Sequence, residues 1–174
     1  MLKRHFMINE LILNVRKTID DWHSNNLKNF KIKKNFDVNN PSCLIKKLAY
    51  HNYCGWHLIE EYQNSNKKTV QFVYDGGLIH NKDRNNCMEI IDEFFYKLQK
   101  NEGHFNSEGF GSIFDRLIND YIKYLHLKES NDIRSDSFYE QIKFLEIALE
   151  QLYKEVLVGS RKITIFKKFK SSGY

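Results

Sequence analysis

The chain has 174 residues, a length that suits one domain. Hydrophobic residues make up 41% of it and aromatic residues 14%, so it can bury a core of ordinary size and is not a disordered chain. The 27 Lys and Arg residues exceed the 22 Asp and Glu residues by a formal charge of +5, which is too small an excess to indicate a dedicated polyanion surface.

Cysteine usage and the amino-terminal segment both indicate a cytoplasmic protein. Cys43, Cys54 and Cys87 form no C-x-x-C motif, and their odd number argues against a disulfide framework. The first apolar stretch is interrupted by Asn9 and Glu10, so it is a poor signal peptide. No run approaches the roughly 18 apolar residues of a membrane span. We therefore expect a reducing compartment and no transmembrane segment.

Two helices are expected in the first part of the chain. Apolar residues recur at helical spacing over residues 4–23, and residues 24–40 then form a connection. Pro41 opens the second helix, with Ser42 as its N-cap. This helix is expected to end near Tyr62.

The next stretch, residues 64–77, gives a mixed signal, because its apolar residues fit either a helix or a short extended piece. A third helix is expected to follow Gly76-Gly77 and to reach about Lys100. A glycine-rich loop then extends through Gly111.

The last part of the chain contains two more expected helices and an extended tail. Ser112 is expected to cap a helix that ends near Lys128. The final helix spans about 137–158 and stops at Gly159, a normal residue just after a helix end. The remaining residues, 160–174, form a strand-like or extended tail.

A possible duplication relates the second and fourth expected helices. Similar residues occur in the two helices at a constant separation of 69 residues, and each helix is followed by another amphipathic helix. These pairs are Lys47 with Arg116, Leu48 with Leu117, His57 with His126, Leu58 with Leu127 and Glu60 with Glu129.

The expected fold is all-α and forms a single domain over residues 1–174. Its architecture is an antiparallel bundle of two similar helical hairpins, 41–101 and 112–159. An amino-terminal helix within 1–40 and the short tail 160–174 complete it.

Two H-x-x-E pairs invite a metal hypothesis, because residues three apart on a helix can reach one ion. The pairs are His57 with Glu60 and His126 with Glu129. At about 100° per residue, however, His57 lies roughly 160° and His126 roughly 135° from the apolar centre of its helix. We therefore expect solvated or rim histidines with no metal or cofactor, and a metal-assisted hydrolase remains the alternative.

Several polar residues are expected to face inward. Asn52 lies within the apolar arc of the second helix, and His80 and Arg84 lie within that of the third. A buried Arg or Asn must be hydrogen-bonded or paired. The group is either a structural network between helices or a pocket for an anion, which suits a guanidinium. The opposite stripe, expected to be solvated, consists of Asn85, Glu89 and Asp92.

Other catalytic templates are missing from the sequence. It has no G-x-S-x-G, P-loop or G-x-G-x-x-G motif. Cys54 and Cys87 lie among apolar neighbours and are expected to be inert. The tail segment IFKKFK could contact nucleic acid, or it could be strapped across the bundle by Phe166 and Phe169.

Four segments together resemble a bacterial family known as domain of unknown function 4254. They are PSCLIKKLAYHNYCGWHLIEEY, DRNNCMEIID, GSIFDRLINDYIKYLHLKE and the closing FKKFK. The match covers about Pro41 to Lys170, and the order and spacing of the segments carry it. Carried over residue by residue, the resemblance points to Asn52, Trp56, His57, Glu61, Arg84, Asn85, Asp92, Asp115, Arg116, Leu117, His126, Phe169 and Lys170.

The chain departs from the family pattern at several positions. Asn86 stands where the family has an acid, and Glu60 stands where it tends to have Asp. The end reads FKKFKSSGY where the family continues with a Tyr-Asn pair. If the acid at Asn86 is essential to an activity, this chain lacks it.

Genes of the resembled family often lie among genes for bacterial surface-polysaccharide and lipopolysaccharide assembly, so the resemblance implies a role in that pathway. We expect a cytoplasmic accessory protein that binds a protein partner or an anionic sugar nucleotide or sugar phosphate, and that can form a homo-oligomer. The candidate ligand-binding residues are Asn52, Trp56, His57, Glu61, His80, Arg84, Asn85, Arg116 and His126. A metal-assisted hydrolase and a nucleic-acid-binding protein are the alternatives.

Overall fold

The computed structural model of the protein describes residues 7–25, 36–37, 39–64, 70–100 and 102–165. This part of the chain is helical apart from its connections and one pair of very short strands, which confirms the all-α prediction. Within it, no helix has the length and apolar character needed to cross a membrane. The elements are α1 (Met7–Ser24), α2 (Pro41–Asn64), α3 (Val70–Tyr96), β1 (His104–Phe105), α4 (Phe110–Glu129), α5 (Arg134–Val158) and β2 (Arg161–Lys162).

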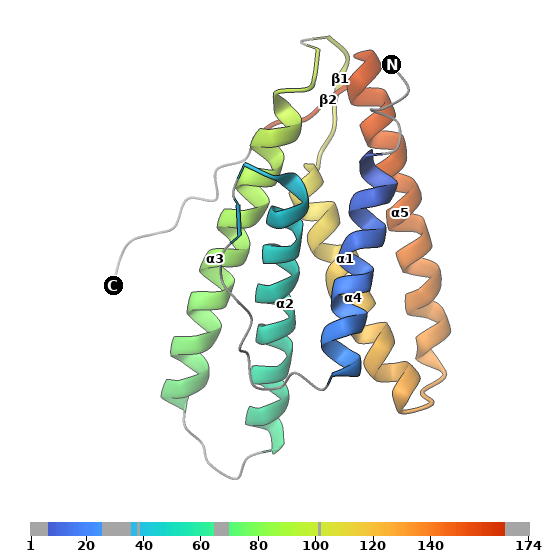
Figure 1. The fold of residues 1–174 in the computed structure, drawn as a ribbon. Coiled ribbons are helices and arrows are strands. Elements are labelled where there is room, and N and C mark those ends of the chain that lie inside the picture. Colours follow the sequence, from blue (N-terminus) through green and yellow to red (C-terminus); the bar gives the residue numbers. More distant parts are fainter. Residues whose placement is uncertain (1–6, 26–35, 38, 65–69, 101, 166–174) are drawn as a thin grey trace.

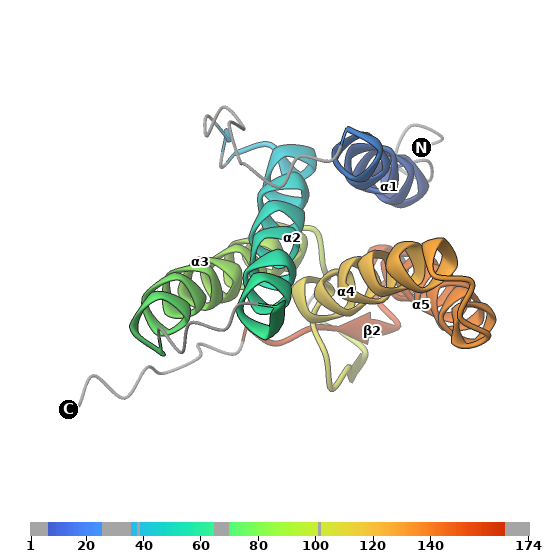
Figure 2. The ribbon, with the colours of Figure 1, turned by 90° about the horizontal axis from the view of Figure 1, so that it is seen from below.

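The helices form two antiparallel hairpins, α2 with α3 and α4 with α5, and α1 packs beside them (Figure 1). Helices α1, α2 and α4 run in the same direction, and α3 and α5 run in the opposite one (Figure 1). Seen along the bundle, α2 lies between α1, α3 and α4 (Figure 2). Helix α4 packs against all four others. The two hairpins and the additional first helix were both predicted.

Apolar side chains at helical spacing hold these helices together. On α1 the buried residues recur every three or four positions, as expected for one face of a helix. Between the hairpins, the rings of Phe95 and Phe110 stack with centroids 4.0 Å apart, and Tyr153 meets both edge-on. Rings in this arrangement stabilise a core beyond their buried area. The largest fully buried side chains are Tyr53, Tyr153, Phe95, Phe110, Phe114, Ile8, Ile19, Leu44, Ile45, Leu48, Ile91 and Leu117.

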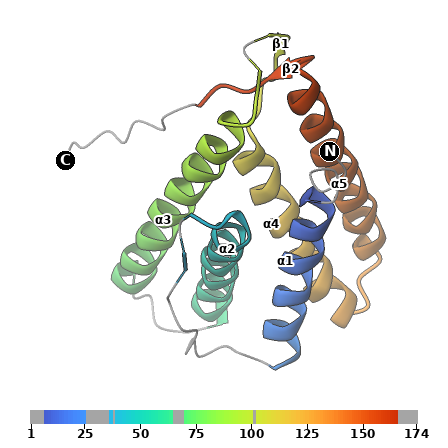
Figure 3. The ribbon, with the colours of Figure 1, turned by 45° about the horizontal axis from the view of Figure 1, so that its top comes forward.

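The two strands join the α3–α4 connection to the segment after α5 (Figure 3). They are parallel, with His104 opposite Arg161. Beyond them, the buried Ile163 donates its backbone N–H to Gln99 Oε1 over 2.8 Å. The chain is therefore extended where it leaves β2, as predicted for the start of the tail. The two residues predicted to strap the tail, Phe166 and Phe169, lie outside the described residues.

Two predicted helix caps are wrong. At α2, Asn40 Oδ1 accepts hydrogen bonds from the backbone N–H groups of Ser42 and Cys43, so Asn40 is the cap in place of Ser42. Proline then occupies the first helical position, where its missing N–H costs nothing. At α4 the helix begins at Phe110, two residues before the predicted cap Ser112.

The cap of α4 comes from a different helix. Asp92 Oδ1 on α3 accepts the backbone N–H of Gly111 over 2.8 Å. A Cβ on Gly111 would lie 2.4 Å from the backbone oxygen of Met88, so glycine lets α3 and α4 approach closely here. Asp92 and its neighbours Asn85 and Glu89 are therefore half-buried, and the prediction of a solvated stripe is wrong.

The predicted boundary at Gly76-Gly77 is also wrong, because α3 begins at Val70 and continues through both glycines. Tertiary contacts decide this: Gly76 lies against Leu58 of α2. The end of α5 is confirmed, since Gly159 follows the helix with a φ of 88°.

Candidate functional site

Two groups of polar side chains lie next to each other in the bundle. The first is the Arg84 pocket, a cavity of about 440 Å³ between α2, α3 and the middle of α4. Its lining residues are His51, Asn52, Gly55, Trp56, Leu58, Ile59, Gly77, Leu78, His80, Asn81, Arg84 and Asn119. The second is the histidine cluster, which we define as His23, His57, Glu60, His126 and Glu129.

A buried carboxylate organises the inner wall of the Arg84 pocket. Asn52 Nδ2 donates to Asp115 Oδ1 over 2.9 Å and to the carbonyl of Leu48 over 3.2 Å. Arg84 Nε lies 3.2 Å from the same Asp115 oxygen, but its N–H does not point at it, so the contact is an ion pair without a good hydrogen bond. This junction confirms that Asn52 is buried and that Arg84 pairs between helices.

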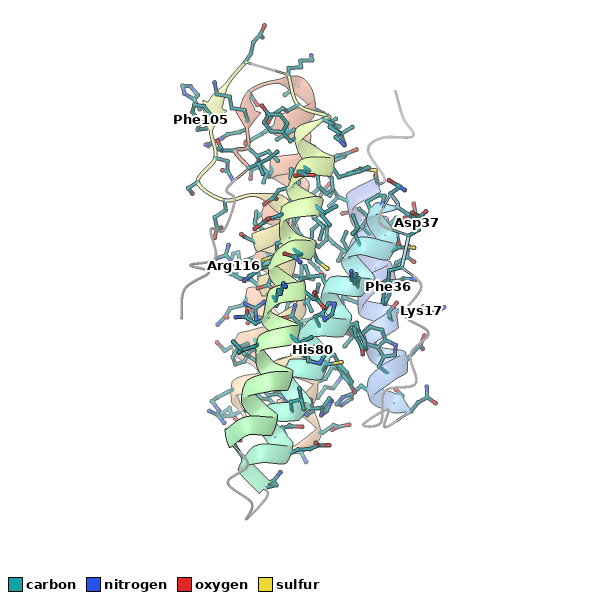
Figure 4. The ribbon with its side chains drawn as sticks, turned by 90° about the vertical axis from the view of Figure 1, so that its left-hand side faces the viewer. Lys17, Phe36, Asp37, His80, Phe105 and Arg116 are labelled. Carbon is teal, nitrogen blue, oxygen red and sulfur yellow. The ribbon has the colours of Figure 1, made fainter. Side chains whose placement is uncertain are left out.

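Two histidines form the adjacent wall. His51 Nδ1 lies 3.1 Å from His80 Nδ1, which is hydrogen-bond distance if one of the rings carries its proton there. His51 is buried and His80 is half-buried. Figure 4 places His80 beside α2 and places Arg116 apart from it, on the other side of α3. The pocket thus combines a guanidinium, two imidazoles and three amides with a largely apolar lining.

The histidine cluster unites the two predicted H-x-x-E pairs with a residue from α1. His57 Nδ1 lies 2.8 Å from Glu60 Oε2, and His126 Nδ1 lies 3.5 Å from Glu60 Oε1. His23 Nε2 lies 2.8 Å from Glu129 Oε1. The His126 ring is 5.2 Å from the His57 ring and 4.9 Å from the His23 ring, measured between centroids. The cluster borders a cavity of about 550 Å³.

The prediction that His57 is solvated or on the rim is wrong, because only 5% of this residue is exposed. The angle between His57 and the apolar centre of α2 does not decide whether His57 is buried, because other helices cover α2 on more than one side. His57 faces α4 and packs edge-on against Tyr53, with centroids 4.4 Å apart. His126 is half-buried, as expected for a rim position.

Burial shifts the pKa values of His126 in the cluster and of the adjacent Tyr53. It lowers the pKa of His126 below its usual value, and the neighbouring His23 and His57 lower it further, whereas Glu60 and Glu129 oppose this. Burial also raises the pKa of Tyr53 to about 12, with additional effects from the charges of Glu129 and Glu60. The lowered pKa favours the neutral form of His126, the form in which imidazole binds metals.

Trp56 separates the two groups and touches both. It lines the Arg84 pocket, its Nε1–H donates to Glu60 Oε1 over 3.0 Å, and its ring stacks on His126 with centroids 5.5 Å apart. The Trp56 indole therefore links the Arg84 pocket to the histidine cluster by direct contact with both.

Other predicted site residues lie outside both groups. Arg116 is exposed and pairs with Glu108. Glu61 and Asn86 are exposed as well, and the half-buried Asn85 lines neither cavity. Among His57, Arg84, Arg116 and His126, whose convergence would favour a single cleft, only His57 and His126 meet.

Sequence spacing missed several residues of these sites, among them His23, His51 and Asn119. His23 lies in the last turn of the first helix, where a lone histidine gives no signal. His51 immediately precedes the predicted Asn52, and Asn119 follows Asp115 by one turn. The family resemblance pointed to Asp115, but residue spacing did not. Only the meeting of α1, α2 and α4 makes these positions neighbours.

The comparison with family models gives one match, over residues 43–165, to the family described as "Protein of unknown function (DUF4254)". Because the match spans well over half of the chain, the protein belongs to this family, as the sequence segments indicated. It includes every residue of the Arg84 pocket and excludes His23. No curated protein and no solved structure matches the chain.

Proposed function

We propose that the protein binds a small anionic ligand, of the size of a sugar phosphate or sugar nucleotide, in the Arg84 pocket. The observation that carries this proposal is the position of the guanidinium, on the wall of a cavity and 35% exposed. A volume of 440 Å³ lies within the usual range of about 300–1,000 Å³ for ligand pockets.

The charges around the pocket support an anion. Among the described residues, Asp115 is the only acid that pairs with Arg84. A guanidinium carries five N–H donors in a planar fork that suits phosphate and carboxylate. Pairing with one carboxylate oxygen therefore leaves donors for a ligand.

The apolar wall supports a ligand with an organic part. Trp56, Leu58 and Ile59 follow one another along α2 and provide an indole and two aliphatic side chains. Flat aromatic and aliphatic surfaces bury the apolar faces of sugars and bases, while a few polar groups fix their orientation. Gly55 keeps this wall open, because no described atom lies within 4 Å of a Cβ built on it.

The family resemblance supports a place for this binding protein in bacterial surface-polysaccharide assembly, as a cytoplasmic accessory protein. Sugar nucleotides and sugar phosphates are the anionic substrates of such assembly. Association with a protein partner or with a second copy stays a prediction of the resemblance. Binding of a protein partner without any small ligand is the main competing outcome.

Thermal-shift titration with UDP-glucose, glucose 1-phosphate and uncharged glucose tests the proposal. The two anions are expected to raise the melting temperature as their concentration increases, because a ligand that binds only the folded state stabilises it. Glucose is expected to have little effect. Arg84→Gln is expected to abolish the response, whereas Arg116→Gln removes an exposed Arg outside the pocket and is expected to keep it.

A second variant guards against simple destabilisation by Arg84→Gln. Gly55→Leu fills the pocket from a position with free space and leaves Arg84 and Asp115 intact. It is expected to fold normally and to lose the anion response. An equal response in wild type, Arg84→Gln and Gly55→Leu would show that these anions do not bind in the pocket.

One observation favours a metal-assisted hydrolase as the second candidate. The two H-x-x-E pairs, which are 69 residues apart in the sequence, meet around Glu60 and His126. Hydrolysis of p-nitrophenyl phosphate by the protein with Zn²⁺, compared with protein in EDTA, tests it; equal background rates would exclude this substrate class. The nucleic-acid alternative rests on residues 165–170, which lie largely outside the described residues.

A further inference from the structure

The histidine cluster has the composition of a metal site. It presents three imidazoles and two carboxylates from three helices: α1 supplies His23, α2 supplies His57 and Glu60, and α4 supplies His126 and Glu129. In two groups of three, the potential ligand atoms all lie within 4.8 Å of one another. The groups are His57, Glu60 and His126, and His23, His126 and Glu129, so His126 belongs to both.

The distances are close to those that a tetrahedral ion imposes. Zn²⁺ binds nitrogen and carboxylate oxygen at about 2.0–2.2 Å, which places neighbouring ligand atoms roughly 3.3 Å apart. His126 Nδ1 and Glu60 Oε1 are separated by 3.5 Å and His57 Nδ1 and Glu60 Oε2 by 2.8 Å. Within this group of three, these two separations are close to the spacing that an ion imposes.

Polar atoms inside the cluster lack hydrogen bonds. The Nε2 atoms of His57 and His126 are both buried, and neither has a hydrogen-bond partner among the described residues. His57 as a whole is 5% exposed. A buried polar atom without a partner costs free energy and calls for an explanation such as a bound ion. The contacts with Glu60 are made by Nδ1 of each ring, so an ion supplies this missing partner where a ring binds it through Nε2.

The electrostatic setting favours a cation. Glu60 and Glu129 supply two negative charges, which balance a divalent ion. His23 and His126 lie in the last turns of α1 and α4, where the helix dipole adds partial negative charge. Because α1, α2 and α4 run in the same direction, their carboxyl ends meet at one end of the bundle (Figure 1).

Neighbouring side chains already orient the ligands. Trp56 Nε1–H donates to Glu60 Oε1 and fixes this carboxylate between the two rings. Tyr53 packs edge-on against His57. Contacts of this kind hold the ligands of a metal site in place and strengthen binding of the metal ion.

We infer that the cluster binds one divalent transition ion of the zinc class through His57, Glu60 and His126, with His23 of the first helix as a further ligand. Imidazole and carboxylate donors together suit Zn²⁺, whereas a site for Mg²⁺ or Ca²⁺ would be built from oxygen atoms. The inference goes beyond anion binding and does not depend on it, since no ligand of the ion contacts Arg84.

Calorimetric titration of Zn²⁺ into EDTA-treated, tag-free full-length protein tests this inference. One ion per chain is expected. Loss of a side chain that only orients a metal ligand typically costs about 10–100-fold in metal affinity, so loss of a direct ligand in His126→Asn is expected to cost about 100-fold or more. His104→Asn, which changes an exposed histidine of β1, is the matched control and is expected to keep the wild-type affinity.

Cobalt provides a second measurement that does not depend on stability. Co²⁺ in a tetrahedral site of nitrogen and oxygen ligands gives visible absorption bands, which are expected in wild type, weakened in His23→Asn and absent in His57→Asn. Circular dichroism of each metal-free variant checks that it has folded. Equal Zn²⁺ affinity in wild type and His126→Asn would overturn the inference. So would binding of Co²⁺ to the wild-type protein without the visible bands of a tetrahedral site. Arg84→Gln is expected to bind Zn²⁺ like wild type, so failure of the anion proposal remains distinguishable.

Discussion

Replacing Asp115 by alanine is expected to lower stability and, at the same time, to strengthen anion binding. This carboxylate is 8% exposed, accepts a hydrogen bond from Asn52, and is the paired acid of Arg84. In Asp115→Ala the amide of Asn52 loses that acceptor, and Arg84 loses its partner. The guanidinium is thereby released toward the pocket.

The magnitude follows from these contacts. A hydrogen bond to a charged acceptor contributes about 1.5–3 kcal/mol. The ion pair adds at most about 1 kcal/mol, because the side chain of Arg84 is 35% exposed and solvent screens it. The free energy of unfolding should therefore fall by about 2–4 kcal/mol. For a chain of this size this corresponds to a melting temperature lower by roughly 5–12 °C.

Urea unfolding followed by circular dichroism measures this loss. Asp120→Ala is the matched control, since Asp120 lies on the same helix and, among the described residues, forms its ion pair with Lys123 three residues later. It is expected to cost less than about 1 kcal/mol. In the double variant Asp115→Ala with Arg84→Gln, the loss of unfolding free energy should be smaller than the sum of the two single losses, because the guanidinium that Asp115→Ala leaves unpaired has also been removed.

The anion titration separates this mechanism from a general loss of structure. A ligand that competes with Asp115 for Arg84 should bind several-fold tighter to Asp115→Ala than to wild type, since about 1 kcal/mol corresponds to roughly fivefold in affinity. A variant that is less stable and also binds the anion more weakly would refute the competition between Asp115 and the ligand. Equal stability of Asp115→Ala and Asp120→Ala would refute the structural role of the junction.

Two further predictions concern packing. Gly55→Ala should raise the free energy of unfolding by about 0.5–1 kcal/mol, because alanine is the better helix former and its Cβ meets no described atom. Gly111→Ala should be clearly destabilising, because its Cβ meets the backbone of Met88. Thermal melts of the two variants check this, and destabilisation by Gly55→Ala would show that the site is closed. Burial raises the pKa of Cys87 to about 11, so at pH 8 this thiol should react with a disulfide reagent far more slowly than the partly exposed Cys43. Mass spectrometry of labelled peptides distinguishes the two, and equal rates would contradict the burial of Cys87.

Helix periodicity predicted the fold, but it could not predict which helix contacts which. The apolar spacing on α1 and the glycine after α5 correspond to local rules, and the structure confirms both. The cap of α4 follows no local rule, because Asp92 comes from α3. Gly76-Gly77 resembled a boundary, yet the helix continues because α2 supports it there. Such contacts join residues far apart in the sequence.

The placement of His57 shows the same limit at the candidate site. An apolar arc predicts one buried face, which is adequate for a helix at the edge of a bundle. Helix α2 instead lies between three others, so a residue roughly opposite its apolar centre can still be buried (Figure 2). Asn52 was predicted correctly because it lies within the arc itself.

If the predicted duplication is real, its separation of 69 residues would give the two sites different origins. It relates His57 to His126 and Glu60 to Glu129, and these four residues meet in one cluster, so corresponding positions of the two hairpins contribute to a shared site. In the Arg84 pocket the same separation leads from Asn52 to Tyr121 and from Arg84 to Tyr153.

Both tyrosines are buried, and they supply no guanidinium or amide to a second pocket. The guanidinium and the imidazoles of the pocket therefore come from the first hairpin, and α4 of the second hairpin contributes Asp115 and Asn119. A duplicated hairpin would supply two ion-binding halves that face each other, whereas anion binding would have to arise in one copy. Loss of Arg84 alone should consequently abolish anion binding, whereas ion binding should be reduced more by the loss of His57 or His126 than by the loss of His23.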